Sequence, residues 1–107
     1  MSVIMTLRIE GNAEALEKYA QEHKQEMKTV LGAAKSHGLI GHRFYGSQDG
    51  SGLIVVDEWP DRQSFESFYE EQADAIRPMF EAAQPKGEPT PMYWEELETG
   101  DAYGWGA

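Results

Sequence analysis

The segment LIVVDEWP at residues 53–60 places two neighbouring acids, Asp57 and Glu58, between four strand-forming apolar residues and Trp59. Because side chains alternate between the two faces of a strand, one acid must point inward and the other outward. An inward carboxylate needs a partner, since burying an unpaired charge costs several kcal/mol. Such a carboxylate could orient a histidine, whose ring exchanges a proton near neutral pH. The chemistry of this segment therefore depends on which acid faces the core.

A predicted hairpin shows which side chains share a face of the sheet. Residues 40–48 and 53–59 both have strand character and are joined by a Gly-rich turn. Symmetric closure over residues 49–52 predicts Trp59 opposite His42, with Asp57 diagonal to His42 and within reach of it. Met5 and Leu7 complete the face that carries Phe44, Asp57 and Trp59, so we interpret Asp57 as the inward acid and His42 with Asp57 as a candidate catalytic pair. A structural hydrogen bond between them, with His42 inert, is the alternative. Glu58 is predicted on the opposite face, paired across the strands with Arg43.

The first half of the chain contains two further elements that would position this pair. Residues 3–10 alternate as a half-buried strand, and Asn12 is a predicted helix N-cap. Apolar residues recur at helical spacing from residue 13 to about residue 36, which predicts one helix. His23 falls on the inward stripe of that helix. It is a candidate to approach the pocket from above, although packing alone would also explain it.

The second half predicts a helix capped by Asp61, a second short helical piece from about Asp74, and a fourth strand over residues 90–97. Pro78 is tolerable there if it lies near the start of that second piece. The order β-α-β-β-α-β predicts an α+β, ferredoxin-like fold, with the helices on one face of an antiparallel sheet. Residues 1–97 form this domain, and residues 98–107 are predicted to be a C-terminal tail without periodicity.

The other sheet face is too apolar to be left in water. Its predicted members are Ile4, Thr6, Tyr45, Ile54, Val56 and Tyr93. A second copy packed sheet against sheet would cover them, so we predict a homodimer.

Composition narrows the possible partners. The chain has 9 Lys plus Arg against 19 Asp plus Glu and a formal charge of −10, which disfavours nucleic acid and anionic membrane surfaces. It has no cysteine, and no apolar run approaches the ~20 residues that span a bilayer. We expect a cytoplasmic protein. No ligand spacing typical of a metal site occurs, so no metal is predicted.

The stretch VVDEWPDRQSFESFYE, in which a tryptophan closes a strand and a helix with paired aromatics follows, resembles the antibiotic biosynthesis monooxygenase-like superfamily of dimeric α+β barrels, which includes members of unknown function. That superfamily includes cofactor-free oxygenases, haem-degrading enzymes and small isomerases. The resemblance implies a role for Trp59 and for a tyrosine on the next helix. Phe65 stands at that helix position here, and Tyr69, one turn further on, could supply a phenol. The haem ligand position falls near Pro78, so we predict no cofactor.

Together these patterns predict a cofactor-independent monooxygenase acting on a planar aromatic or enolisable small molecule. His42 would remove a proton and Asp57 would orient the ring. A non-catalytic small-molecule-binding dimer, an isomerase using the same pocket and a dimer without a ligand are the alternatives. The predicted ligand pocket comprises His23, Phe44, Trp59, Phe65, Tyr69, Met79 and Trp94.

Overall fold

The computed structural model describes residues 1–105, within which the chain forms four strands and three helices. In chain order these are β1 (Val3–Glu10), α1 (Ala13–Glu22), α2 (Lys24–Ser36), β2 (Gly41–Gly46), β3 (Gly52–Trp59), α3 (Arg62–Ala82) and β4 (Pro91–Trp94). The strands pair antiparallel in the order β2-β3-β1-β4. This arrangement confirms the predicted ferredoxin-like α+β fold.

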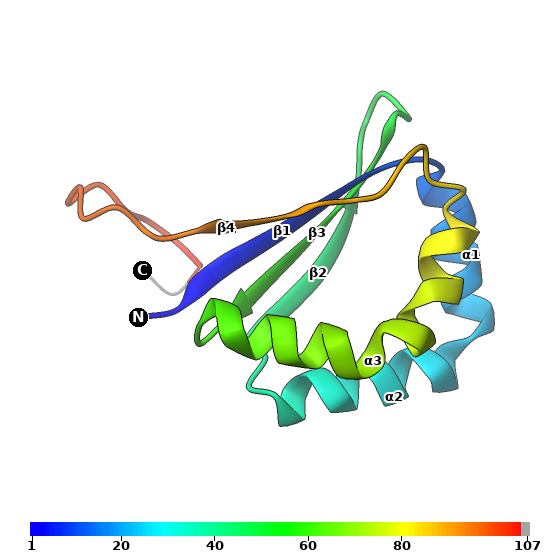
Figure 1. Cartoon of the computed structure of the whole chain (residues 1–107). Helices are drawn as coiled ribbons and strands as arrows, with labels where there is room; N and C mark the ends of the chain where they lie inside the picture. The colour runs from blue at the N-terminus through cyan, green and yellow to red at the C-terminus, as the bar shows by residue number, and fades with distance from the viewer. Residues whose placement is uncertain (106–107) are drawn as a thin grey trace.

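The helices form one layer and the sheet forms the other (Figure 1). All three helices lie on the same side of the sheet, and α1 meets the C-terminal part of α3 at one end of the helical layer. The opposite sheet face carries no element of the chain within residues 1–105. The site therefore has to be sought either between the two layers or on the open face.

Strict alternation along β1 and β3 builds the core. Met5, Leu7 and Ile9 on β1, with Leu53 and Val55 on β3, are each at most 5% exposed. Their neighbours at even-numbered positions face the open side and, apart from the buried Gly52, keep contact with solvent. The helix-facing side of the sheet is thus the one the period-2 pattern indicated.

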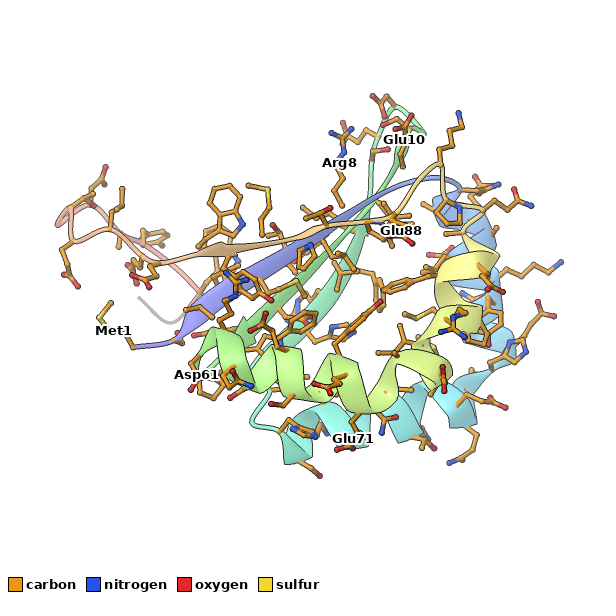
Figure 2. All side chains as sticks on the ribbon, in the orientation of Figure 1. Met1, Arg8, Glu10, Asp61, Glu71 and Glu88 are labelled. Atoms are coloured by element: carbon orange, nitrogen blue, oxygen red, sulfur yellow. The ribbon has the colours of Figure 1, made fainter. Side chains whose placement is uncertain are left out.

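Two helices begin at the predicted capping residues. The Asn12 side chain accepts a hydrogen bond from the Ala15 N–H at the start of α1. Asp61 accepts from the Ser64 N–H at the start of α3, where Figure 2 labels it. Each side chain satisfies a backbone donor that the first helical turn leaves without an intrahelical partner.

The hairpin register differs from the predicted one by two residues. His42 lies opposite Asp57, not opposite Trp59, and Arg43 lies opposite Val56, not opposite Glu58. The loop closes earlier because the Ser47 N–H bonds to the Gly52 carbonyl, which brings Gly52 into β3. A shift of two residues preserves the face of every side chain, so the predicted faces of Asp57 and Glu58 are correct although their partners are not.

The prediction that Tyr93 lies on the open face of the sheet was wrong. Tyr93 pairs with Met5 and lies on the helix side, whereas Trp94 pairs with Ile4 and lies on the open side. The Tyr93 ring packs edge-on against Phe65, and the Arg62 guanidinium lies 4.5 Å from the centre of the Tyr93 ring. Burial raises the pKa of the Tyr93 hydroxyl, and the neighbouring Glu66 carboxylate adds to this.

The single helix predicted for residues 13–36 is two helices. His23 has non-helical backbone angles between α1 and α2, and its ring stacks on Tyr19 at a centroid distance of 3.9 Å. Its Nδ1–H donates to the Tyr19 carbonyl, which therefore does not need the usual backbone donor at the end of α1. No apolar residue occurs between Ala20 and Met27, so no buried stripe holds the two segments in line.

The two predicted helical pieces after Asp61 are one continuous helix, α3, with Pro78 inside it. Pro78 has no N–H to give to the carbonyl of Asp74, a loss that usually kinks a helix. Figure 1 shows the yellow C-terminal part of α3 turned away from the direction of its green N-terminal part. The buried side chains of Phe65, Phe68 and Ile76 lie along the helix before the proline and favour its continuation.

Residues 98–105 form no helix or strand, and the side chains of Tyr103 and Trp105 are fully exposed. Residues 106 and 107 of the predicted tail lie outside the described part of the chain, and the domain boundary at residue 97 stays a prediction. None of the helices in residues 1–105 is long and apolar enough to cross a membrane.

Candidate functional site

A buried carboxylate links a histidine and a tryptophan at one end of the sheet. Asp57 is 5% exposed, and its Oδ1 lies 2.6 Å from Nδ1 of His42. Its Oδ2 accepts a hydrogen bond of 3.1 Å from Nε1 of Trp59. Both carboxylate oxygens of Asp57 therefore have a donor, which is how a protein interior accommodates a charge.

The strand register holds this group in place. His42 of β2 and Met5 of β1 flank Asp57 on either side, and all three side chains face the helices. Trp59 follows Asp57 by two residues on the same face and is completely buried. Phe65 and Phe68 of α3 pack on the Trp59 ring at centroid distances of 5.7 and 5.5 Å. The indole is thereby fixed, and it fixes one oxygen of Asp57 in turn.

His42 has one ring nitrogen engaged and one available. Because a carboxylate only accepts, the Nδ1 that faces Asp57 carries a proton. Nε2 makes no hydrogen bond to residues 1–105 and carries a lone pair when the ring is neutral. The His42 side chain is 30% exposed, and Nε2 is the ring nitrogen left for a ligand.

An apolar cavity of about 90 Å³ lies between the helices and the sheet beside this group. His42 and Asp57 line it together with residues of all three helices. Exposed residues of its wall include Glu26 on α2 and Tyr69 and Ala75 on α3.

Most of the predicted site residues meet at this cavity. Those that line it are His42, Phe44, Asp57, Phe65, Tyr69 and Met79. Trp59 lies behind Asp57 and contributes its N–H without lining the cavity. Whether any of these residues is catalytic stays a prediction.

Two predicted pocket residues lie elsewhere. His23 sits at the break between α1 and α2, where its ring contacts Tyr19, and it does not line the cavity. Trp94 lies on the open sheet face and donates to the hydroxyl of Thr6 at 2.7 Å. His23 lies outside the cavity because the helix breaks at this residue. Trp94 lies outside it because its side chain in β4 points to the face opposite to the predicted one.

The sequence interpretation also missed part of the cavity wall. The missed residues of the helices and the following loop include Tyr19, Glu26, Met27, Val30, Leu31 and Leu39. Met27, Val30, Leu31 and Ala34 recur at helical spacing, so the apolar stripe of α2 was a usable signal for them. Tyr19 could not be found this way, because its position depends on the turn at His23.

Within residues 1–105, no group of three or more His, Cys, Asp or Glu side chains is arranged to hold a metal ion. His37, at the C-terminal end of α2, instead contacts Glu71 of α3, with 3.0 Å between Nε2 and Oε2. The hydrogen bond from His37 lowers the pKa of the Glu71 carboxyl group. Figure 2 shows Glu71 on the side of α3 that faces away from the sheet, so this pair joins two helices outside the cavity.

Neither a protein-family model nor a curated protein matches the sequence. Solved structures share its fold. A dimeric ferredoxin-like protein from an uncultured marine organism has a TM-score of 0.66 at 11% identity, over 91% of this chain and 89% of the other.

Two oxygenases show the same likeness. A monooxygenase from the gene ActVA-Orf6 of Streptomyces coelicolor, solved with the ligand Nanaomycin D, has a TM-score of 0.60 at 16% identity, over 92% of this chain and 88% of the other. SnoaB, a cofactor-independent oxygenase from Streptomyces nogalater, solved as a single-residue mutant, has a TM-score of 0.58 at 12% identity, over 92% of this chain and 95% of the other. At such identities the likeness establishes the fold. The chain thus has the ferredoxin-like fold of the antibiotic biosynthesis monooxygenase-like proteins, as the segment around Trp59 indicated.

Proposed function

We propose that the protein is a cofactor-independent monooxygenase acting on a planar aromatic or enolisable small molecule. The observation that carries the proposal is the hydrogen-bonded series His42–Asp57–Trp59 beside an apolar cavity. The shared fold of two oxygenases supports it, one of them cofactor-independent.

In this proposal His42 is the general base. Nε2 removes a proton from an acidic O–H or C–H of the bound molecule, and Asp57 stabilises the imidazolium that results. The electron pair left on the substrate adds to dioxygen and forms a carbon–oxygen bond. Protonation by His42 gives a hydroperoxide. Loss of the remaining hydrogen from the same carbon and cleavage of the O–O bond then release water and leave a carbonyl group on the substrate. The substrate supplies all the electrons that reduce dioxygen, so no cofactor is needed.

We further propose that the working unit is a homodimer formed by the open sheet faces. Tyr45, Met92 and Trp94 on this face are each about half exposed, and Ile54 and Val56 lie between them on β3. An apolar surface of this kind usually marks an interface. One structure of the same fold is a dimeric ferredoxin-like protein, which supports this assembly.

Oxygen consumption tests the proposed reaction. Wild-type protein is mixed with an electron-rich phenol such as 4-methoxyphenol, and dioxygen uptake above the uncatalysed rate is recorded. His42→Gln should lower this rate by roughly 10²-fold or more, the contribution typical of a positioned base. Glu58→Gln, next to Asp57 but on the other face, is the matched control and should retain the wild-type rate.

An isomerase remains the second candidate, because a base that removes a proton can return it to another carbon. Uptake of deuterium from D2O into the substrate without oxygen consumption would favour the isomerase. Ligand binding without either reaction would favour a binding protein. A His42→Gln variant with the wild-type oxidation rate would contradict the proposal directly.

A further inference from the structure

We infer that the cavity selects uncharged ligands with a single ring and one hydroxyl group, of the phenol or enol type, and disfavours fused-ring compounds and carboxylates. The inference rests on the proposed function only in taking Nε2 of His42 as the polar contact of the ligand. The limits on the size and charge of the ligand come from the walls of the cavity.

The floor of the cavity is only two rows of side chains long. One row is Met5, Asp57 and His42, and the next is Leu7, Val55 and Phe44. Successive rows on one face of a sheet lie about 7 Å apart. The rows beyond carry Trp59 at one end and Ile9 with Leu53 at the other, all packed into the core and outside the cavity wall. Along the strands, this floor is the length of one six-membered ring.

The volume of the cavity also limits the ligand to a single ring. An engineered apolar cavity of about 150 Å³ accepts benzene, whereas this cavity measures about 90 Å³. Three methionines, Met5, Met27 and Met79, line it, and their unbranched side chains can shift to accept one ring. A second fused ring would have to displace Val30, Phe65 or Phe80, whose branched or aromatic side chains have fewer rotatable bonds than methionine.

The polar groups of the wall decide the charge of the ligand. Both oxygens of Asp57 are already bonded, so the wall beside Asp57 offers the ligand only the lone pair on His42. A lone pair on Nε2 calls for a donor, which a neutral hydroxyl supplies and a carboxylate does not. Glu26, exposed in the first turn of α2, places a further acid in the wall of a chain whose net charge is −10. A carboxylate ligand would therefore be repelled.

Equilibrium binding of three probes tests the inference. Phenol, 2-naphthol and 4-hydroxybenzoate are titrated into the wild-type protein, and the Met methyl and His ring signals are followed by NMR. Phenol should bind at least about tenfold more tightly than either of the other two, because misfit in a shaped pocket produces discrimination of this order. Equal binding of phenol and 2-naphthol, or no binding of phenol, would overturn the inference.

Two variants separate the size limit from the charge limit. Glu26→Gln should tighten the binding of 4-hydroxybenzoate and leave phenol unchanged, whereas Glu17→Gln, on the exposed side of α1, should change neither. Phe80→Ala should admit 2-naphthol, with Val30→Ala as a milder truncation if Phe80→Ala does not fold. A Glu26→Gln variant with unaltered affinity for 4-hydroxybenzoate would refute the role of Glu26.

The outcomes also distinguish this inference from the proposed function. Selective binding of phenol without any oxygen consumption would refute the monooxygenase and leave the selectivity standing. Oxidation that depends on His42, combined with equal binding of one-ring and fused-ring probes, would refute the selectivity and leave the monooxygenase standing.

Discussion

The two faces of the sheet are built from the same strands but meet different surroundings. On the helix-covered face, Met5, Leu7, Leu53 and Val55 are almost completely buried. On the open face, aromatic and aliphatic side chains such as Tyr45 and Trp94 are about half exposed. The covered face therefore contributes its burial energy within one chain, whereas the open face can gain its share only from a second molecule.

The neighbouring acids Asp57 and Glu58 show the difference most clearly. Asp57 is buried and has a nitrogen donor for each oxygen. Glu58, partly exposed on the open face, accepts a hydrogen bond from the Ser2 hydroxyl at 2.5 Å. A shift of one position along β3 thus changes a carboxylate from part of a candidate reaction centre to a surface group.

The largest expected effect comes from placing a charge on the open face. Val56→Asp would bury an unpaired carboxylate at the centre of the proposed dimer interface in each copy, which should dissociate the dimer. Sedimentation velocity at micromolar protein should show a dimer for the wild type and a monomer for the variant. Val56→Thr, similar in shape and uncharged, is the control. A wild-type protein that sediments as a monomer would contradict the dimer.

Truncating adjacent residues of β3 compares the two faces directly. Leu53→Ala should lower the free energy of unfolding by roughly 2–5 kcal/mol, because it leaves a cavity in the core. Ile54→Ala, on the open face, should lower the free energy of unfolding of the dissociated single chain clearly less, since within one chain this side chain contacts solvent. Urea denaturation followed by tryptophan fluorescence measures both. Equal losses would mean that the open face is as tightly packed as the core.

The two acids should respond differently to loss of their carboxylates. Asp57→Ala leaves the buried Nε1–H of Trp59 without an acceptor, which should cost about 1–3 kcal/mol of unfolding free energy. Asp57→Asn should recover part of this, because its amide oxygen can still accept. Glu58→Gln should stay within about 0.5 kcal/mol of the wild type, as is usual at the surface. Thermal unfolding of the three variants checks this order, and a larger loss for Glu58→Gln would reverse the assignment of the faces.

The smallest effect is expected at Asp61, which belongs to neither face and measures a purely local contribution. Hydrogen bonds from the Ser64 N–H and hydroxyl lower the pKa of the Asp61 carboxyl group. Its stabilising contribution is therefore present above the usual aspartate pKa of about 3.9 and is lost as the pH falls through the lower, folded-state value. The stability difference between wild type and Asp61→Asn should shrink in acid. A difference that stays constant down to the lowest pH would rule out the carboxylate as the cause.

Several features could be predicted from the sequence because they depend on neighbouring residues. The alternation along β1 and β3 indicated the inward direction of Asp57, and a two-residue error in register left that direction intact. The caps at Asn12 and Asp61 are equally local, since each bonds to a backbone N–H three residues later. The pairing of His42 with Asp57 was predictable for the same reason: a hairpin keeps the two close in sequence.

Contacts between distant segments decided the rest. The sequence does not show which sheet face Tyr93 and Trp94 take, because both are aromatic and adjacent. Their faces are fixed by the pairing of β4 with β1. The continuation of α3 through Pro78 depends on how the helix packs, because Phe65, Phe68 and Ile76 are buried along it. The size of the cavity follows from these same contacts. A periodic pattern determines which face a side chain takes, but only tertiary packing determines which elements meet across that face and how much space they leave.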